Sequence, residues 1–113
     1  MTPEGKVKRW ASDYLKRELV PCKLYRPPGG PFGTAGEPDL HVTYGGCKGV
    51  IEAKVEYGEP TPLQQARMRE YVAAGALGMF LRGRDERKLA LFVKLMKERA
   101  ECLKLIIGQQ SQA

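Results

Sequence analysis

The segment GEPDLHVTYGGCKGVIEAKVE, residues 36–56, constrains the fold of this chain more than any other part of its sequence. Polar and apolar residues alternate on both sides of a glycine turn, a pattern typical of two strands joined as a hairpin. Yet Asp39 begins the first strand, and Glu52 and Lys54 lie in the second, where a covered sheet face normally carries apolar side chains. Any fold for this chain has to account for two acidic side chains and one basic side chain on the same hairpin.

The hairpin predicts strands at residues 39–44 and 50–56, with the turn at residues 45–49. Successive side chains of a strand point to opposite faces of the sheet. One face would carry Leu40, Val42, Tyr44, Ile51, Ala53 and Val55. The other face would carry Asp39, His41, Thr43, Val50, Glu52 and Lys54. The three charges therefore meet on the same side of the hairpin.

Two helices are predicted from cap residues and apolar spacing, at residues 2–19 and 61–74. Both open with a threonine cap followed by a proline in the first helical position, and Gly75 is a stop signal for the second. On a helical wheel, Glu4 falls on the apolar side of the first helix. Its carboxylate is therefore expected to look toward the core or its rim.

The remaining segments complete an α/β pattern. Proline and glycine at residues 27–37 predict a loop, and residues 78–83 predict a short buried strand. A last helix is expected at about residues 85–107, before a frayed tail, QQSQA. The order helix, strand, strand, helix, strand, helix predicts an α/β fold with a mixed central β-sheet flanked by α-helices, in which the middle helix allows a parallel crossover.

The last helix has two apolar stripes. The first would cover the sheet with Leu89, Phe92, Val93, Met96, Ala100 and Leu103. The second consists of Leu91, Leu95, Cys102 and Ile106. The second stripe would serve as the interface of a homodimer or pack inside one chain.

A length of 113 residues fits one domain, residues 1–113, with a single core. No apolar run has the length of a membrane span or the form of a secretory signal, so a cytoplasmic protein without membrane contact is expected. Cys22, Cys47 and Cys102 form no CxxC pair and leave an odd count, which predicts reduced thiols rather than disulfides or a zinc site.

A net charge of +6 suits a polyanion partner, and nucleic acid is the leading candidate. The basic excess is concentrated between residues 6 and 26. The candidate phosphate contacts are Lys6, Arg9, Arg26 and Lys48. Each of them alone is more often a solvated charge than a phosphate contact, and a basic surface by itself is common in soluble proteins.

Carboxylates at the start of one strand and in the middle of its neighbour converge, because neighbouring strands lie about 4.8 Å apart. Two such charges repel unless a cation lies between them, and Mg²⁺ prefers oxygen ligands and keeps several waters. Asp39 and Glu52 are the candidate ligands, with the backbone carbonyl of Ala53 as a third. Lys54 would orient an attacking water and offset charge on a phosphodiester transition state.

These residues resemble the PD-(D/E)XK nuclease signature, with Gly36-Glu37-Pro38-Asp39 as one half and Glu52-Ala53-Lys54 as the other. Glu4 matches the additional acidic residue that many of these enzymes carry on the first helix. Thr61-Pro62-Leu63-Gln64 and the later Ala73-Ala74-Gly75-Ala76 resemble elements of the VRR-NUC branch, the virus-type replication and repair nucleases. The resemblance covers residues 3–83. Within the branch, the chain resembles the stand-alone phage or bacterial members.

The resemblance implies a restriction-endonuclease-like core and a Mg²⁺- or Mn²⁺-dependent endonuclease acting on DNA. Glu4 and Gln64 would join Asp39, Glu52 and Lys54 in the site, with Glu4 also as a metal ligand. Short members of the branch resemble dimeric enzymes that cut branched DNA such as four-way (Holliday) junctions, which implies a homodimeric junction resolvase.

Each site residue also has a structural explanation. Asp39 after a proline is a common turn residue, and charges on an exposed edge hairpin would account for Glu52 and Lys54. Glu4 suits the dipole at a helix N-terminus. Gln64 fits a capping box, and Gln65 would take its place in the site if the register is shifted by one.

Three further residues near the site carry no firm assignment. His41 shares a face with Asp39, and a lone histidine is more often a packing residue than a catalyst. Tyr57 and Arg82 are near the site by chain position only and receive no role. Two functional alternatives also stay open: a catalytically silent DNA-binding or scaffold module, and a flap, RNA or other nuclease of the same fold.

Overall fold

The computed structural model describes residues 1–29 and 33–112, which form one four-stranded sheet and three helices. The strands are β1 (Lys23–Tyr25), β2 (Leu40–Tyr44), β3 (Cys47–Lys54) and β4 (Leu77–Arg82). The helices are α1 (Pro3–Glu18), α2 (Pro62–Ala73) and α3 (Glu86–Gln112).

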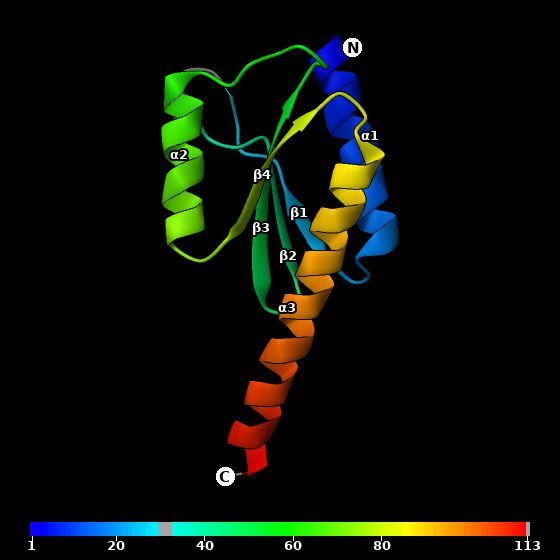
Figure 1. Cartoon of the computed structure of the whole chain (residues 1–113), viewed down its shortest axis with the longest axis vertical. Helices are drawn as coiled ribbons and strands as arrows, with labels where there is room; N and C mark the ends of the chain where they lie inside the picture. The colour runs from blue at the N-terminus through cyan, green and yellow to red at the C-terminus, as the bar shows by residue number, and fades with distance from the viewer. Residues whose placement is uncertain (30–32, 113) are drawn as a thin grey trace.

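The sheet is mixed, with the strand order β1-β2-β3-β4. β1, β2 and β3 pair antiparallel, whereas β3 and β4 pair parallel because α2 carries the chain back across the sheet between them. Helices α1 and α3 lie on one side of the sheet and α2 lies on the other (Figure 1). The expected α/β architecture, a mixed sheet flanked by helices, is confirmed.

The main core fills the layer between the sheet and the two helices α1 and α3. It consists of Val7, Ala11, Tyr14, Leu15, Leu19, Leu40, Val42, Ile51, Ala53, Leu81, Leu89, Phe92, Val93 and Met96. On the other face, α2 packs its Met68 against Gly78 of β4, where an added Cβ would lie 2.6 Å from the Met68 sulfur. The polar face of the hairpin is therefore the face that α2 covers.

The hairpin turn is shorter than the sequence suggested. Gly45 and Gly46 have φ angles of 57° and 84°, and Tyr44 pairs directly with Cys47. Two residues with positive φ close the two-residue turn whose twist matches that of paired strands. The predicted turn at residues 45–49 is therefore wrong, because β3 begins at Cys47.

The far end of β3 also differs from the prediction. The strand ends at Lys54, and Gly58 donates its amide to the carbonyl of Val55 in the turn that follows. Val55 is 38% exposed and does not complete the apolar face, so its assignment to that face is wrong.

The predicted starts of the first two helices are confirmed. Thr2 accepts the amide of Gly5 at 3.0 Å, and Thr61 forms a full capping box at the start of α2. Gly75, with φ +102°, follows the end of α2 as expected.

Two other segments differ from the sequence prediction. Strand β1 was missed, because three residues are too few to show an alternating pattern. Helix α3 continues to Gln112, so the expected frayed tail is helical up to that residue. Residues 30–32 of the predicted loop and residue 113 of the tail lie outside the described residues.

Helix α3 extends beyond the body of the protein and gives the molecule its long dimension of 50 Å (Figure 1). The second stripe of this helix is exposed, with Leu91 at 54%, Leu95 at 36% and Ile106 at 52%. It therefore does not pack inside the chain.

The three cysteines are free thiols, as predicted. Within the described residues, no helix is both long enough and apolar enough to cross a bilayer.

Replacing Gly49 by Val should lower the free energy of unfolding by about 1–3 kcal/mol, because even one added methyl carbon would lie 2.5 Å from Cζ of the buried Phe92. Gly29→Val is the matched control, since no atom of the described residues lies within 4 Å of an added Cβ there. Urea denaturation of both variants measures the difference. Equal stability of the two variants would contradict close packing of α3 on β3.

Candidate active site

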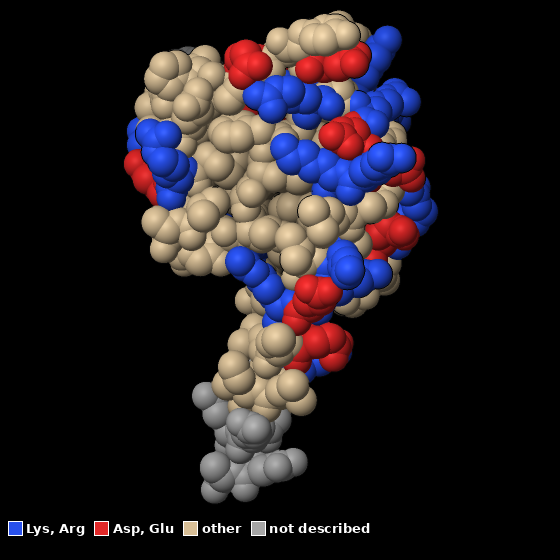
Figure 2. All heavy atoms as spheres, viewed as in Figure 1, with Lys and Arg blue, Asp and Glu red and all other residues tan. Residues whose placement is uncertain are grey.

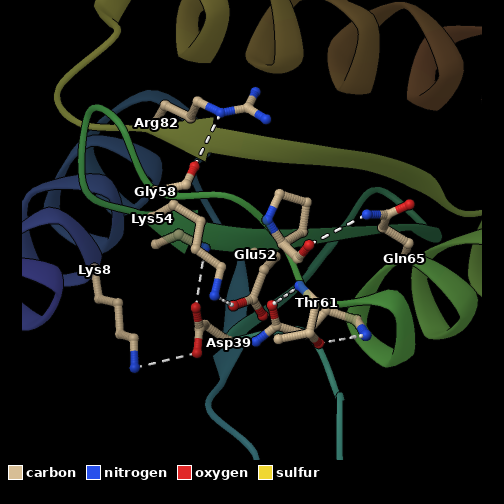
Figure 3. Close-up of polar contacts among 11 residues, drawn as sticks. Lys8, Asp39, Glu52, Lys54, Gly58, Thr61, Gln65 and Arg82 are labelled. Carbon is tan, nitrogen blue, oxygen red and sulfur yellow. Dashed lines mark hydrogen bonds and ion pairs between the residues drawn. The ribbon is translucent and has the colours of Figure 1, made fainter.

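The candidate site lies at the edge of the sheet where β3 ends and β2 begins. Leu40 pairs with Ile51 in the antiparallel ladder, so Asp39, one residue before β2, reaches the end of β3. Asp39 Oδ2 accepts the backbone amide of Ala53 at 2.9 Å. This bond fixes the Asp39 carboxylate against β3, beside Glu52 (Figure 3).

Helix α1 adds a third carboxylate to this edge. One carboxylate oxygen from each of Glu4, Asp39 and Glu52 lies within 4.8 Å of the others. The first turn of α1 places Glu4 there, on the helix side that faces the sheet. The structure thus brings together the three side chains that the sequence predicted as metal ligands.

Glu52 is the most buried of these carboxylates, with 2% of its surface exposed. Its pKa is raised to about 8, mainly by burial and also by the neighbouring charges of Asp39 and Glu4, while Lys54 opposes the rise. Among the described residues, Glu52 Oε1 has no hydrogen-bond partner. The negative charge of ionised Glu52 is therefore only partly compensated by the groups around it.

Two lysines approach the carboxylates (Figure 3). Nζ of the buried Lys54 lies 3.6 Å from Glu52 Oε2, on the same strand face. Nζ of Lys8 lies 3.1 Å from Asp39 Oδ1. Lys8 was not among the predicted site residues, although its position one helical turn after Glu4 is a signal that could have identified it.

The donor set fits a hard divalent cation. All three side chains offer carboxylate oxygens, which Mg²⁺ and Mn²⁺ prefer. A dication among them would supply the partner that Glu52 Oε1 lacks and remove the repulsion that raises the pKa of Glu52. The carbonyl of Ala53 stays a predicted further ligand.

The three carboxylates line a cavity of about 290 Å³. Lys8, Gly36 and Gln64 also line it. The cavity therefore gathers α1, the segment before β2, the end of β3 and the start of α2 around one space.

Gln64 lines this cavity while also capping α2. The Gln64 side-chain oxygen accepts a hydrogen bond from the Thr61 backbone amide at 2.9 Å, and the Gln64 backbone amide donates to Thr61 Oγ1 at 3.1 Å. The capping role is thus present, and only the side-chain NH₂ group remains for a ligand. Gln65 donates instead to the Pro60 carbonyl and does not line the cavity.

The predicted phosphate contacts are exposed but dispersed. Lys6 and Arg9 lie on the outer side of α1, and Arg26 donates to the buried Ser12 hydroxyl at 2.8 Å. Lys48 places its ammonium 5.2 Å from the ring centre of Tyr71. On the face shown in Figure 2, basic side chains are interspersed with acidic ones around an uncharged centre, so this face has no uniform positive field.

His41 belongs to a buried cluster on the α2 side of the sheet. Its Nε2 lies 3.2 Å from Glu37 Oε1 without forming a hydrogen bond, and the Tyr71 hydroxyl donates to that same oxygen. Burial, with Lys48 nearby, lowers the pKa of His41, and burial with the Glu37 contact raises the pKa of Tyr71 to about 12. The sequence did not predict this contact between the segment before β2 and α2.

Arg82 and Tyr57 lie outside the carboxylate group. Arg82 donates to the Gly58 carbonyl at 3.2 Å and pairs with Glu59 at 2.9 Å, so it holds the loop between β3 and α2 (Figure 3). Tyr57 is almost fully exposed.

No protein-family model matches the sequence, and no curated protein matches it. A solved structure described as "VRR_NUC domain" superposes on 83% of this chain and 97% of its own, with a TM-score of 0.64 and 22% sequence identity. The chain has the VRR-NUC fold. The resemblance inferred from the motifs is confirmed at the level of the fold.

The raised pKa of Glu52 predicts that stability depends on pH. Folding raises this pKa from 4.5 to about 8, so the folded protein binds an extra proton between those values. Without metal, the free energy of unfolding should fall as pH rises from 4.5 to 8, by at most about 1.4 kcal/mol per pH unit from this group.

Urea denaturation at several pH values in EDTA tests this expectation. Glu52→Gln should remove that part of the slope, because its amide does not titrate. Identical slopes for the wild type and Glu52→Gln would contradict it.

Proposed function

We propose that this chain acts as a single nuclease domain that hydrolyses phosphodiester bonds in DNA with the help of a divalent cation. The observation that carries the proposal is the convergence of Glu4, Asp39 and Glu52 within 4.8 Å. The Lys54 ammonium lies beside them. The VRR-NUC fold supports the same conclusion.

Glu4, Asp39 and Glu52 would hold Mg²⁺ or Mn²⁺, with the Ala53 carbonyl as a further ligand. When bound, such a cation polarises a phosphodiester and lowers the pKa of a water molecule. Asp39 enters this arrangement already oriented, because one of its oxygens is fixed by the Ala53 amide. Glu52 Oε1, which has no hydrogen-bond partner in the described part of the chain, would be available to ligate.

Lys54 has the geometry of a positioning cation. Its ammonium is buried at the same carboxylate, where it would orient the attacking water by hydrogen bonding and offset charge that builds on the phosphate oxygens. Lys8 reaches the cavity from α1 and would contact the phosphate from the other side. The Gln64 NH₂ group would add a neutral donor.

Branched DNA, such as a four-way junction, is the substrate that the family resemblance favours. Lys6, Arg9, Arg26 and Lys48 would contact phosphates without reading bases, so shape rather than sequence would select the substrate.

A homodimer would present two such sites to one junction. The exposed residues Leu91, Leu95, Cys102 and Ile106 of α3 follow one another at intervals of 4, 7 and 4 residues, so they lie on one side of the helix over about four turns. A second copy of the same helix suits this stripe, because associating helices bury one apolar stripe against another. In such a dimer the same stripe of each chain would contact its copy in the other chain, as two-fold symmetry requires.

Cleavage of a labelled four-way junction tests the activity, beside linear duplex, flap and single strand, in Mg²⁺, Mn²⁺ or EDTA. Asp39→Asn and Lys54→Ala should each lower the cleavage rate by at least about 10²-fold, because each removes charge at the reacting phosphate. Lys97→Ala is the matched control, since Lys97 is exposed on α3 and does not line the cavity.

The substrates separate the alternatives. Cleavage confined to flaps or ends would keep the nuclease proposal and remove junction selectivity. DNA binding without cleavage of any substrate would favour a silent binding module.

Light scattering tests the dimer. The wild type should have the mass of two chains, and the double variant Leu91→Glu with Ile106→Glu should have the mass of one. Lys97→Glu, which places the same charge elsewhere on α3, should leave the dimer intact. A monomeric wild type at the concentrations used for cleavage would contradict the interface.

A further inference from the structure

A second hollow of about 450 Å³ adjoins the carboxylate cavity on the α2 side of the sheet. Its walls include Tyr25, Glu37, His41, Lys48 and Tyr71. Glu37 and Thr34 line both hollows, so the two spaces share a wall. None of the proposed catalytic residues lines this second hollow.

The aromatic groups in this hollow have a definite arrangement. His41 stands edge-on to two tyrosine rings, at 5.2 Å and 84° to Tyr71 and at 6.0 Å and 75° to Tyr25. Lys48 lies over the Tyr71 ring. Tyr25, on the edge strand β1, is 56% exposed and has no cation over its ring among the described residues.

The rest of the wall is held in place. Tyr71 donates to Glu37, and His41 is 6% exposed beneath them. These contacts join α2 to the segment before β2, so the hollow has fixed polar walls and one open aromatic surface. Its volume also falls in the range of small-ligand sites.

From this geometry we infer that the hollow binds one unpaired nucleobase of the strand whose phosphate occupies the carboxylate cavity. The base stacks on Tyr25, because base–aromatic stacking accepts any base and needs an exposed ring. Lys48 contacts a phosphate of the same strand. This inference rests on the proposed function for the position of the strand.

The charges in the hollow favour a base over a phosphate. A phosphate at the shared wall would face the Glu37 carboxylate, whereas a base carries no charge and can donate from its N–H groups to that carboxylate. A base inside a duplex is paired and stacked and is not available to this hollow. The site would therefore select DNA with an unpaired nucleotide next to the cleaved bond, as branch points and flaps provide.

Binding without metal tests the inference separately from cleavage. A short single strand that contains 2-aminopurine, and its matched duplex, are titrated with protein in EDTA. The single strand should show quenched fluorescence on binding, and Tyr25→Ala should weaken its affinity about tenfold or more. Tyr25→Phe keeps the ring and should bind like the wild type.

Tyr57→Ala is the matched control, because Tyr57 is exposed and lines neither hollow. Circular dichroism and melting temperatures verify that the variants fold. Equal affinity of Tyr25→Ala and Tyr57→Ala, or equal quenching with duplex, would overturn the inference. If binding depends on Tyr25 but the protein cuts no substrate, the base-binding subsite stands and the nuclease proposal is overturned. If the protein cuts DNA but Tyr25→Ala does not change binding, the nuclease proposal stands and the subsite is overturned.

Discussion

The antiparallel pairing of β2 with β3 is the constraint on which the rest of the site depends. Its register, set by the two-residue glycine turn, places Leu40 opposite Ile51 and brings Asp39 to the Ala53 amide. A shift of one residue would reverse the faces of β3, because side chains alternate. Glu52 and Lys54 would then enter the main core, and the carboxylates would no longer meet.

This arrangement has an energetic cost that a structural hairpin would avoid. Three carboxylates converge, one of them buried, and the raised pKa of Glu52 records how unfavourable its ionised form is there. Lys8 and Lys54 offset only part of that charge. Strongly shifted groups in a cavity are typical of functional sites, where a ligand completes the electrostatics. Under the proposed function, a divalent cation and a phosphodiester together would provide that completion.

Much of the fold and of the carboxylate site could be predicted, because the signals are local. Threonine caps and alternating strands identified the elements, and helical spacing turned Glu4 toward Asp39 and Glu52. The turn length and the end of β3 at Lys54 were predicted wrongly, because pairing decides where a strand stops. The contact between Tyr71 and Glu37 was missed, since it joins residues 34 positions apart that carry no shared pattern.

The sequence by itself determined the order of the main elements, the polar face of the hairpin and the types of residue on it, because caps, turns and periodicity act within a few residues. Only the tertiary structure decided that Lys8 pairs with Asp39, that the capping residue Gln64 also lines the cavity, and that a second hollow adjoins the first. These features arise where helices pack against the sheet. Their geometry depends on how distant side chains fill the space between the elements, which no local pattern encodes.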